Sequence, residues 1–126
     1  MSQPIDKVIL VGHCGADTGS LEWFVEEAMN LPVESANSAS KLQAAMTPQS
    51  LLMVNRLLEG NFPTMEGVEL IGALHRMGNA PKMMLISNYA DAQALAVKLG
   101  AIQGFGKSQI GQASLKEYLQ SLLKSE

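Results

Sequence analysis

The sequence predicts an α/β protein with a five-stranded parallel sheet, doubly wound, with helices on both faces. Short, continuous apolar runs alternate with longer stretches of helical periodicity, and the connections between them are short. A chain of 126 residues that is 47% hydrophobic and 17% charged can bury the core of one domain. We therefore expect residues 1–126 to form a single domain with right-handed crossovers.

Five short runs are expected to form the strands. The three clearest contain no polar residue, and they are Val8–Val11, Leu51–Val54 and Met83–Ile86. Two weaker candidates are Val33–Ala36 and Ala101–Phe105. Continuous apolar runs are typical of parallel strands that helices cover on both faces.

The segments between the strands carry the helical pattern. Four stretches repeat apolar residues at intervals of three and four, and they lie at 21–29, 70–77, 95–99 and 115–123. A shorter helix is expected from Ser38 to Met46, ending before Pro48. Gly78 and Gly100 follow two of the stretches as helix stops. Ser114 and Glu117 predict a capping box at the start of the last helix.

Charge and cysteine content exclude several classes of function. Nine basic residues face twelve acidic ones, which gives a net charge of −3, and no basic run argues for nucleic-acid binding. The longest apolar stretches have about four residues, whereas a spanning helix needs roughly 20. A single cysteine excludes an intrachain disulfide and suits a reducing compartment. With no signal peptide visible, we expect a cytoplasmic protein that binds neither nucleic acid nor membranes.

The residues that follow the strands are the candidates for a functional site, because ligands of open parallel sheets bind beyond the carboxyl ends of the strands. These residues are Gly12, His13, Cys14, Asn55, Arg56, Ser87, Asn88 and Lys107. His13 and Cys14 are too few for a zinc site, which usually needs four ligands. No Ser-His-Asp or Cys-His arrangement has a supporting spacing. We expect no cofactor, no metal and no enzymatic activity.

Four segments resemble the response-regulator receiver domain, the chemotaxis-type single-domain signalling family. They are Leu51–Arg56, Met65–Leu70, Met84–Asp91 and Gly100–Lys107. The resemblance covers nearly the whole chain and implies the flavodoxin-like receiver fold and a part in two-component, phosphorelay-type signal transduction. In that family an acidic pair ends the first strand and a phosphate-accepting Asp ends the third. A Ser or Thr ends the fourth strand, and a Lys follows the fifth.

The resemblance assigns switch-equivalent positions to Ser87, Phe105 and Lys107. Ser87 takes the hydroxyl position and Lys107 the lysine position. The family's aromatic residue lies three positions before the lysine, where this chain has Gly104. A slip of one residue would place Phe105 on the aromatic position and Ser108 on the lysine position.

The three carboxylates of the family are missing. Gly12 and His13 hold the positions of the acidic pair, and Asn55 holds the phosphoacceptor position. An amide cannot form an acyl phosphate, Gly12 offers no side-chain ligand, and a neutral imidazole is a poor ligand for Mg²⁺. The chain therefore resembles an atypical receiver, a pseudo-receiver that lacks the phosphoacceptor Asp.

The expected function is a phosphorylation-independent protein–protein interaction. The resemblance places the partner, or a second copy, on the face of the fourth helix, fifth strand and fifth helix. Exposed contacts are expected at Gln93, Lys98, Lys116 and Gln120.

Two alternatives stay open. One is a receiver phosphorylated on a relocated acid such as Asp17. The other is a regulatory domain that binds a small anion near Asn55, Ser87 and Lys107, unless Asp17 or Asp91 pairs with that lysine.

Overall fold

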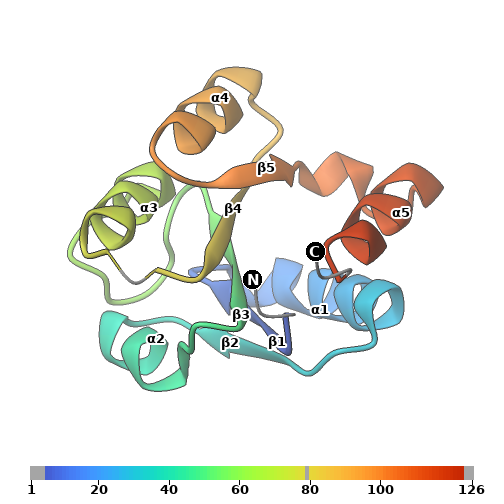
Figure 1. Cartoon of the computed structure of the whole chain (residues 1–126), viewed down its shortest axis with the longest axis horizontal. Coiled ribbons are helices and arrows are strands. Elements are labelled where there is room, and N and C mark those ends of the chain that lie inside the picture. The colour runs from blue at the N-terminus through green and yellow to red at the C-terminus, as the bar shows by residue number, and fades with distance from the viewer. Residues whose placement is uncertain (1–4, 79, 124–126) are drawn as a thin grey trace.

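One parallel sheet lies between two layers of helices (Figure 1) in the computed structural model, which describes residues 5–78 and 80–123. The strands are β1 (Lys7–Val11), β2 (Val33–Ala36), β3 (Ser50–Asn55), β4 (Lys82–Ile86) and β5 (Ile102–Phe105). Their order in the sheet is β2-β1-β3-β4-β5, and every pair is parallel. The predicted doubly wound fold is confirmed, including the two weaker strands.

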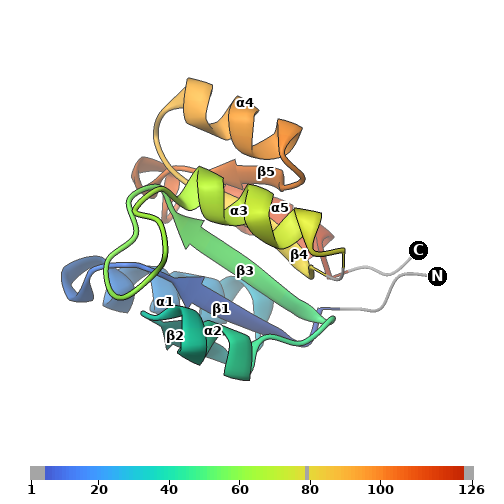
Figure 2. The same cartoon turned by 90° about the vertical axis from the view of Figure 1, so that its left-hand side faces the viewer.

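Helices cover both faces of this sheet. They are α1 (Gly15–Met29), α2 (Ala39–Ala45), α3 (Gly67–Arg76), α4 (Ala90–Lys98) and α5 (Ala113–Ser121), with a 3-10 turn η1 (Lys107–Gln109). Helices α1 and α5 pack together on one face, and α2, α3 and α4 lie on the other (Figures 1 and 2). Within the described ranges, no helix combines the length and the apolar character needed to cross a membrane.

The core has two halves, one on each face of the sheet. Leu10, Met53 and Met84 face α1 and α5, whereas the neighbouring residues Val11 and Val54 belong to the half under α2, α3 and α4. Successive side chains of a strand point to opposite faces, so a strand covered on both sides must be apolar throughout. This explains the continuous runs in β1, β3 and β4.

Glycines end two of the helices. Gly78 and Gly100 have φ of 94° and 123°, a left-handed conformation that glycine adopts without steric cost. The start of α5 differs from the prediction. The helix begins at Ala113 after Gln112, whose side chain makes no cap hydrogen bond, so the capping box expected at Ser114 is wrong. The turn at Gly111, with φ of 95°, brings the chain into the helix two residues before the predicted start.

A β-bulge interrupts the pairing of β4 with β5. Met84 pairs with Ile102 and Ile86 pairs with Phe105, so β5 contains one residue more than β4 between the two pairs. Inside the bulge, a Cβ atom on Gly104 would lie 2.0 Å from the carbonyl oxygen of Leu85. A side chain at this position is therefore excluded.

The side chain of Gln93 fills the gap that the bulge opens. Its Nε2 donates to the Leu85 carbonyl at 2.8 Å, and its Oε1 accepts from the Gly104 amide at 3.2 Å. Gln93 is 8% exposed, so the expectation that it is an exposed contact is wrong. An amide can replace the missing ladder hydrogen bonds, and a buried backbone group left unpaired is costly.

The bulge makes a direct prediction about stability. We expect Gly104→Ala to lower the free energy of unfolding by about 3 kcal/mol, because the new methyl group must displace Leu85 or Gln93. Urea denaturation measures this change.

A matched control is Gly19→Ala in α1, where a Cβ atom meets nothing within 4 Å. This variant should gain up to about 1 kcal/mol, because alanine loses less backbone entropy than glycine in a helix. Similar stabilities for the two variants would contradict the account of the bulge.

Candidate functional site

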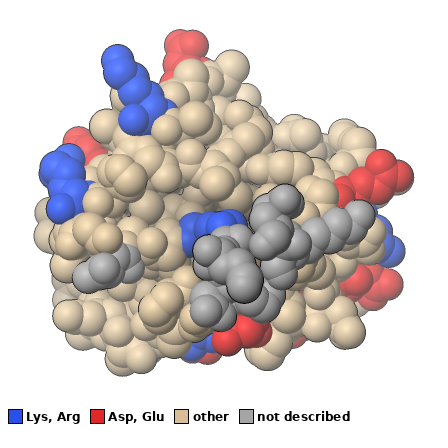
Figure 3. Space-filling view, viewed as in Figure 1, with Lys and Arg blue, Asp and Glu red and all other residues tan. Residues whose placement is uncertain are grey.

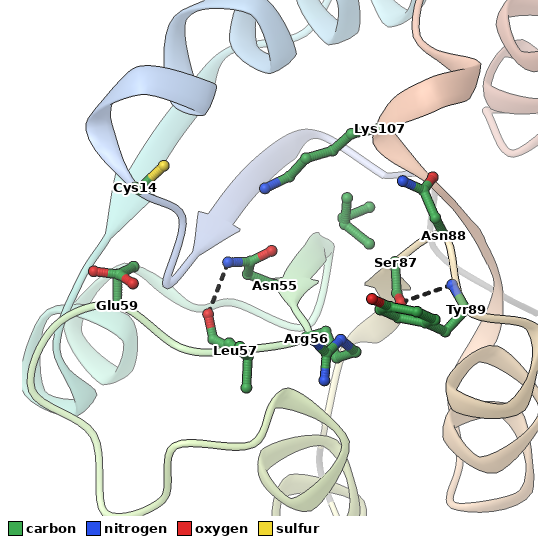
Figure 4. Close-up of a pocket in the computed structure, with 10 residues that line it drawn as sticks. Cys14, Asn55, Arg56, Leu57, Glu59, Ser87, Asn88, Tyr89 and Lys107 are labelled. Carbon is green, nitrogen blue, oxygen red and sulfur yellow. Dashed lines mark hydrogen bonds between the residues drawn. The ribbon is translucent and has the colours of Figure 1, made fainter.

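A pocket of about 410 Å³ lies beyond the carboxyl ends of β1, β3 and β4 (Figure 4). We call it the strand-end pocket. Its lining consists of Cys14, Asn55, Arg56, Leu57, Glu59, Ile86, Ser87, Asn88, Tyr89 and Lys107. The structure thus brings together Asn55, Ser87 and Lys107, three of the site residues predicted from the sequence.

Asn55 ties the end of β3 to two other segments. Its Nδ2 group donates to the carbonyl of Gly12 at 3.2 Å and to the carbonyl of Leu57 at 2.7 Å. Both N–H groups of the amide therefore donate to backbone oxygens. A carboxylate, which has no proton to donate, could not make these bonds.

Gly12 and His13 do not line the strand-end pocket. Gly12 has φ of 72°, and a Cβ atom there would lie 2.6 Å from Cδ2 of Leu58. His13 is 1% exposed, and its Nε2–H donates to the Met53 carbonyl at 2.9 Å. The positions expected for an acidic pair thus hold a tight turn and a buried ring. No group of three or more His, Cys, Asp or Glu residues that could hold a metal occurs in the described part of the chain.

The loop between β4 and α4 forms the opposite wall. Ser87 Oγ accepts from the backbone N–H of Tyr89 at 3.1 Å. Asn88 Oδ1 accepts from the Ser108 hydroxyl at 2.9 Å and from the Ser108 backbone N–H at 3.3 Å. A Cβ atom on Gly106 would overlap this Oδ1, so the chain needs glycine there. Lys107 lines the pocket, whereas the Ser108 hydroxyl donates to Asn88.

Arg56 and Tyr89 form a contact that the sequence reasoning missed. The guanidinium carbon of Arg56 lies 4.7 Å from the centroid of the Tyr89 ring, a cation–π distance. Arg56 follows β3 and is expected at the strand ends, but nothing in its spacing from Tyr89 predicts the pair. Leu57 and Tyr89 are 45% and 61% exposed, so the pocket has an apolar rim.

The remaining predicted residues lie elsewhere. Phe105 is 2% exposed and packs in the half of the core under α1 and α5, while Gly104 contacts Gln93. The switch-equivalent role of Phe105 stays a prediction. Asp91 lines a groove between α3 and α4 together with Arg56 and Glu66, not the strand-end pocket. Asp17 belongs to α1, and its side chain lies outside the described residues.

Comparison with known proteins shows the fold. No protein-family model and no curated protein matches the chain. A response regulator from Colwellia psychrerythraea is 22% identical over 94% of this chain and 96% of its own, with a TM-score of 0.67. A putative response regulator from Chloroflexus aurantiacus is 15% identical over 94% and 98%, with a TM-score of 0.73. A CheY-like receiver domain protein from Methanospirillum hungatei is 21% identical over 94% and 96%, with a TM-score of 0.64. The chain has the receiver (CheY-like) fold.

Replacing the amide of Asn55 tests how the site is built. In Asn55→Asp a carboxylate would face the carbonyls of Gly12 and Leu57, so we expect a loss of about 1–3 kcal/mol of unfolding free energy at neutral pH. The same contacts should raise the pKa of the new carboxyl group. Because a raised carboxyl pKa means that the folded state holds its proton longer, the loss should shrink as the pH falls toward about 4.

Asn88→Asp is the matched control, because its remaining oxygen still accepts from Ser108. Urea denaturation of both variants and of the wild type over this pH range is the measurement. Equal losses of unfolding free energy in the two variants would show that the hydrogen bonds donated by Asn55 do not stabilise the fold.

Proposed function

We propose that this protein is a pseudo-receiver, a non-enzymatic cytoplasmic module of signal transduction that binds a partner without being phosphorylated. The observation that carries the proposal is the bonding of Asn55, whose amide donates to two backbone carbonyls where the receiver family has its phosphoacceptor Asp. Phosphoryl transfer to a receiver needs a carboxylate nucleophile and oxygen ligands for Mg²⁺. Gly12 and His13 offer the pocket no such ligand.

The packing of α4 supports a single conformation. Besides its two bonds in the bulge, Gln93 Nε2 lies within hydrogen-bond distance of the carbonyls of Ser87 at 3.1 Å and Phe105 at 3.2 Å. One buried amide thus connects the start of α4 with both β4 and β5. A helix held in this way needs no chemical signal to fix its position.

The face formed by α4, β5 and α5 is where we place the partner or a second copy. A groove of about 370 Å³ between α4 and β5 is lined by Phe105 and by small or uncharged polar residues, among them Ala90, Ala94 and Gln103. The Tyr118 hydroxyl donates to the Gln103 carbonyl and joins α5 to this face. Burial raises the pKa of the Tyr118 phenol, so the hydroxyl keeps its proton at neutral pH.

The surface charges agree with a protein partner. Figure 3 shows basic and acidic side chains mixed in this view, and the described residues form no cluster of Lys and Arg on it. Nucleic-acid binding depends on clustered Lys and Arg. This distribution supports the proposal that the partner is a protein.

The function is tested by exposing the protein to a small phosphodonor. After incubation with acetyl phosphate and Mg²⁺, we expect the intact mass to be unchanged, because no carboxylate stands at position 55. Stoichiometric, acid-labile phosphate incorporation would overturn the proposal. Glu59→Gln would then show whether Glu59, which lines the pocket, is the relocated acceptor.

The role of Gln93 is tested by Gln93→Ala. We expect faster hydrogen exchange at the Gly104 amide and a loss of about 1–3 kcal/mol of unfolding free energy, because buried backbone groups lose their partner. Gln120→Ala, on the exposed side of α5, is the control and should change neither quantity. An unchanged exchange rate at Gly104 in the Gln93 variant would remove this support for a fixed α4.

A further inference from the structure

We propose that the strand-end pocket binds an oxyanion, a carboxylate or phosphate group, carried on an apolar or aromatic body. Such a ligand could be a free organic anion or an acidic side chain next to an apolar one. This binding does not depend on whether the face of α4, β5 and α5 binds a partner.

Internal hydrogen bonds leave the wall between β4 and α4 rich in donors. Asn88 Oδ1 accepts two hydrogen bonds from Ser108. The Nδ2 group of Asn88 donates to no neighbour in the described ranges, so it can donate to a ligand. Figure 4 shows this nitrogen on the pocket side of Asn88. Ser87 is 8% exposed, and its Oγ already accepts from Tyr89 N–H, so its own proton remains to be donated. Two neutral residues therefore meet a ligand as donors.

Charged residues add to these neutral donors. Among the described residues of the lining, Arg56 and Lys107 are basic and Glu59 is acidic. Figure 4 shows the Lys107 amine directed toward the middle of the pocket, with Glu59 on the far side near Cys14. Stacking on Tyr89 orients the guanidinium of Arg56 and leaves its N–H groups able to donate. Hydrogen bonds from charged donors to an oxyanion are the strong ones.

The size and rim of the pocket indicate more than a bare ion. A volume of about 410 Å³ is in the range of small-molecule sites and far larger than a phosphate ion. Leu57 and Tyr89, both well exposed, border the polar floor. An apolar or aromatic group attached to the oxyanion can bury part of this rim, which adds to the free energy of binding.

Three probes test the ligand chemistry by amide NMR titration of the whole chain. They are inorganic phosphate, phenyl phosphate and the acidic dipeptide N-acetyl-Asp-Phe-amide. We expect phenyl phosphate to bind more tightly than inorganic phosphate, with shifts concentrated at residues 55–59 and 87–89. Tighter binding of the dipeptide would identify a protein side chain as the source, and tighter binding of phenyl phosphate a free anion. Absence of shifts with all three, or equal affinity for the two phosphates, would overturn the proposal.

Matched variants separate the site from general electrostatics. Asn88→Asp keeps the acceptor for Ser108 but replaces the donor by a negative charge, and it should weaken phenyl phosphate binding by about tenfold or more. Gln109→Glu adds the same charge nearby and keeps the acceptor for the Gly106 amide, so binding should change little.

Arg56→Ala tests the site a second time, with Arg76→Ala on the exposed end of α3 as its control. The Arg56 variant should also lose about tenfold in affinity, while the Arg76 variant should not. Thermal unfolding confirms that each variant is folded. If each control weakens binding as much as its partner, the attraction comes from the whole surface charge and the proposed site is wrong.

Discussion

Two side-chain amides, those of Asn55 and Gln93, hold the strand ends together by hydrogen bonds to backbone groups of neighbouring segments. Asn55 donates to Gly12 and Leu57 beyond β3, and Gln93 bridges Leu85 and Gly104 inside the bulge of β5. These bonds join segments that are far apart in the sequence, and the one to the Gly104 amide satisfies a buried N–H that would be costly to leave unpaired. The strand-end pocket and the position of α4 both depend on them.

The same bonding changes the chemistry of the pocket. In the receiver family that this chain resembles, carboxylates at the strand ends hold a cation and accept the phosphate. Here Asn55 donates to two backbone carbonyls and His13 is buried against the Met53 carbonyl. As far as the structure describes the lining, its charged residues are Arg56, Lys107 and Glu59. The anion proposed for this pocket would meet donors from Arg56, Ser87 and Asn88.

The apolar pattern was enough to predict the architecture, because burial on both faces of a parallel sheet makes the inner residues of β1, β3 and β4 continuously apolar. The glycine stops at Gly78 and Gly100 were also readable, since a left-handed residue favours glycine. Gln93 could not be placed in this way. Its position on the helix suggests exposure, and only the bulge between β4 and β5 turns it inward. Ser114 failed for a similar reason, because the turn before α5 set the start of the helix.

The sequence by itself determined the fold, the order of the elements and the absence of carboxylates at positions 12, 13 and 55. These properties follow from residue type and from spacing along the chain, which need no knowledge of distant contacts. The tertiary structure decided which polar atoms remain available in the pocket. It stacked Arg56 on Tyr89, turned His13 inward and occupied Asn88 with Ser108. Such pairings join residues far apart in the sequence, and a hydrogen bond already made by one atom determines what its neighbour can still bind.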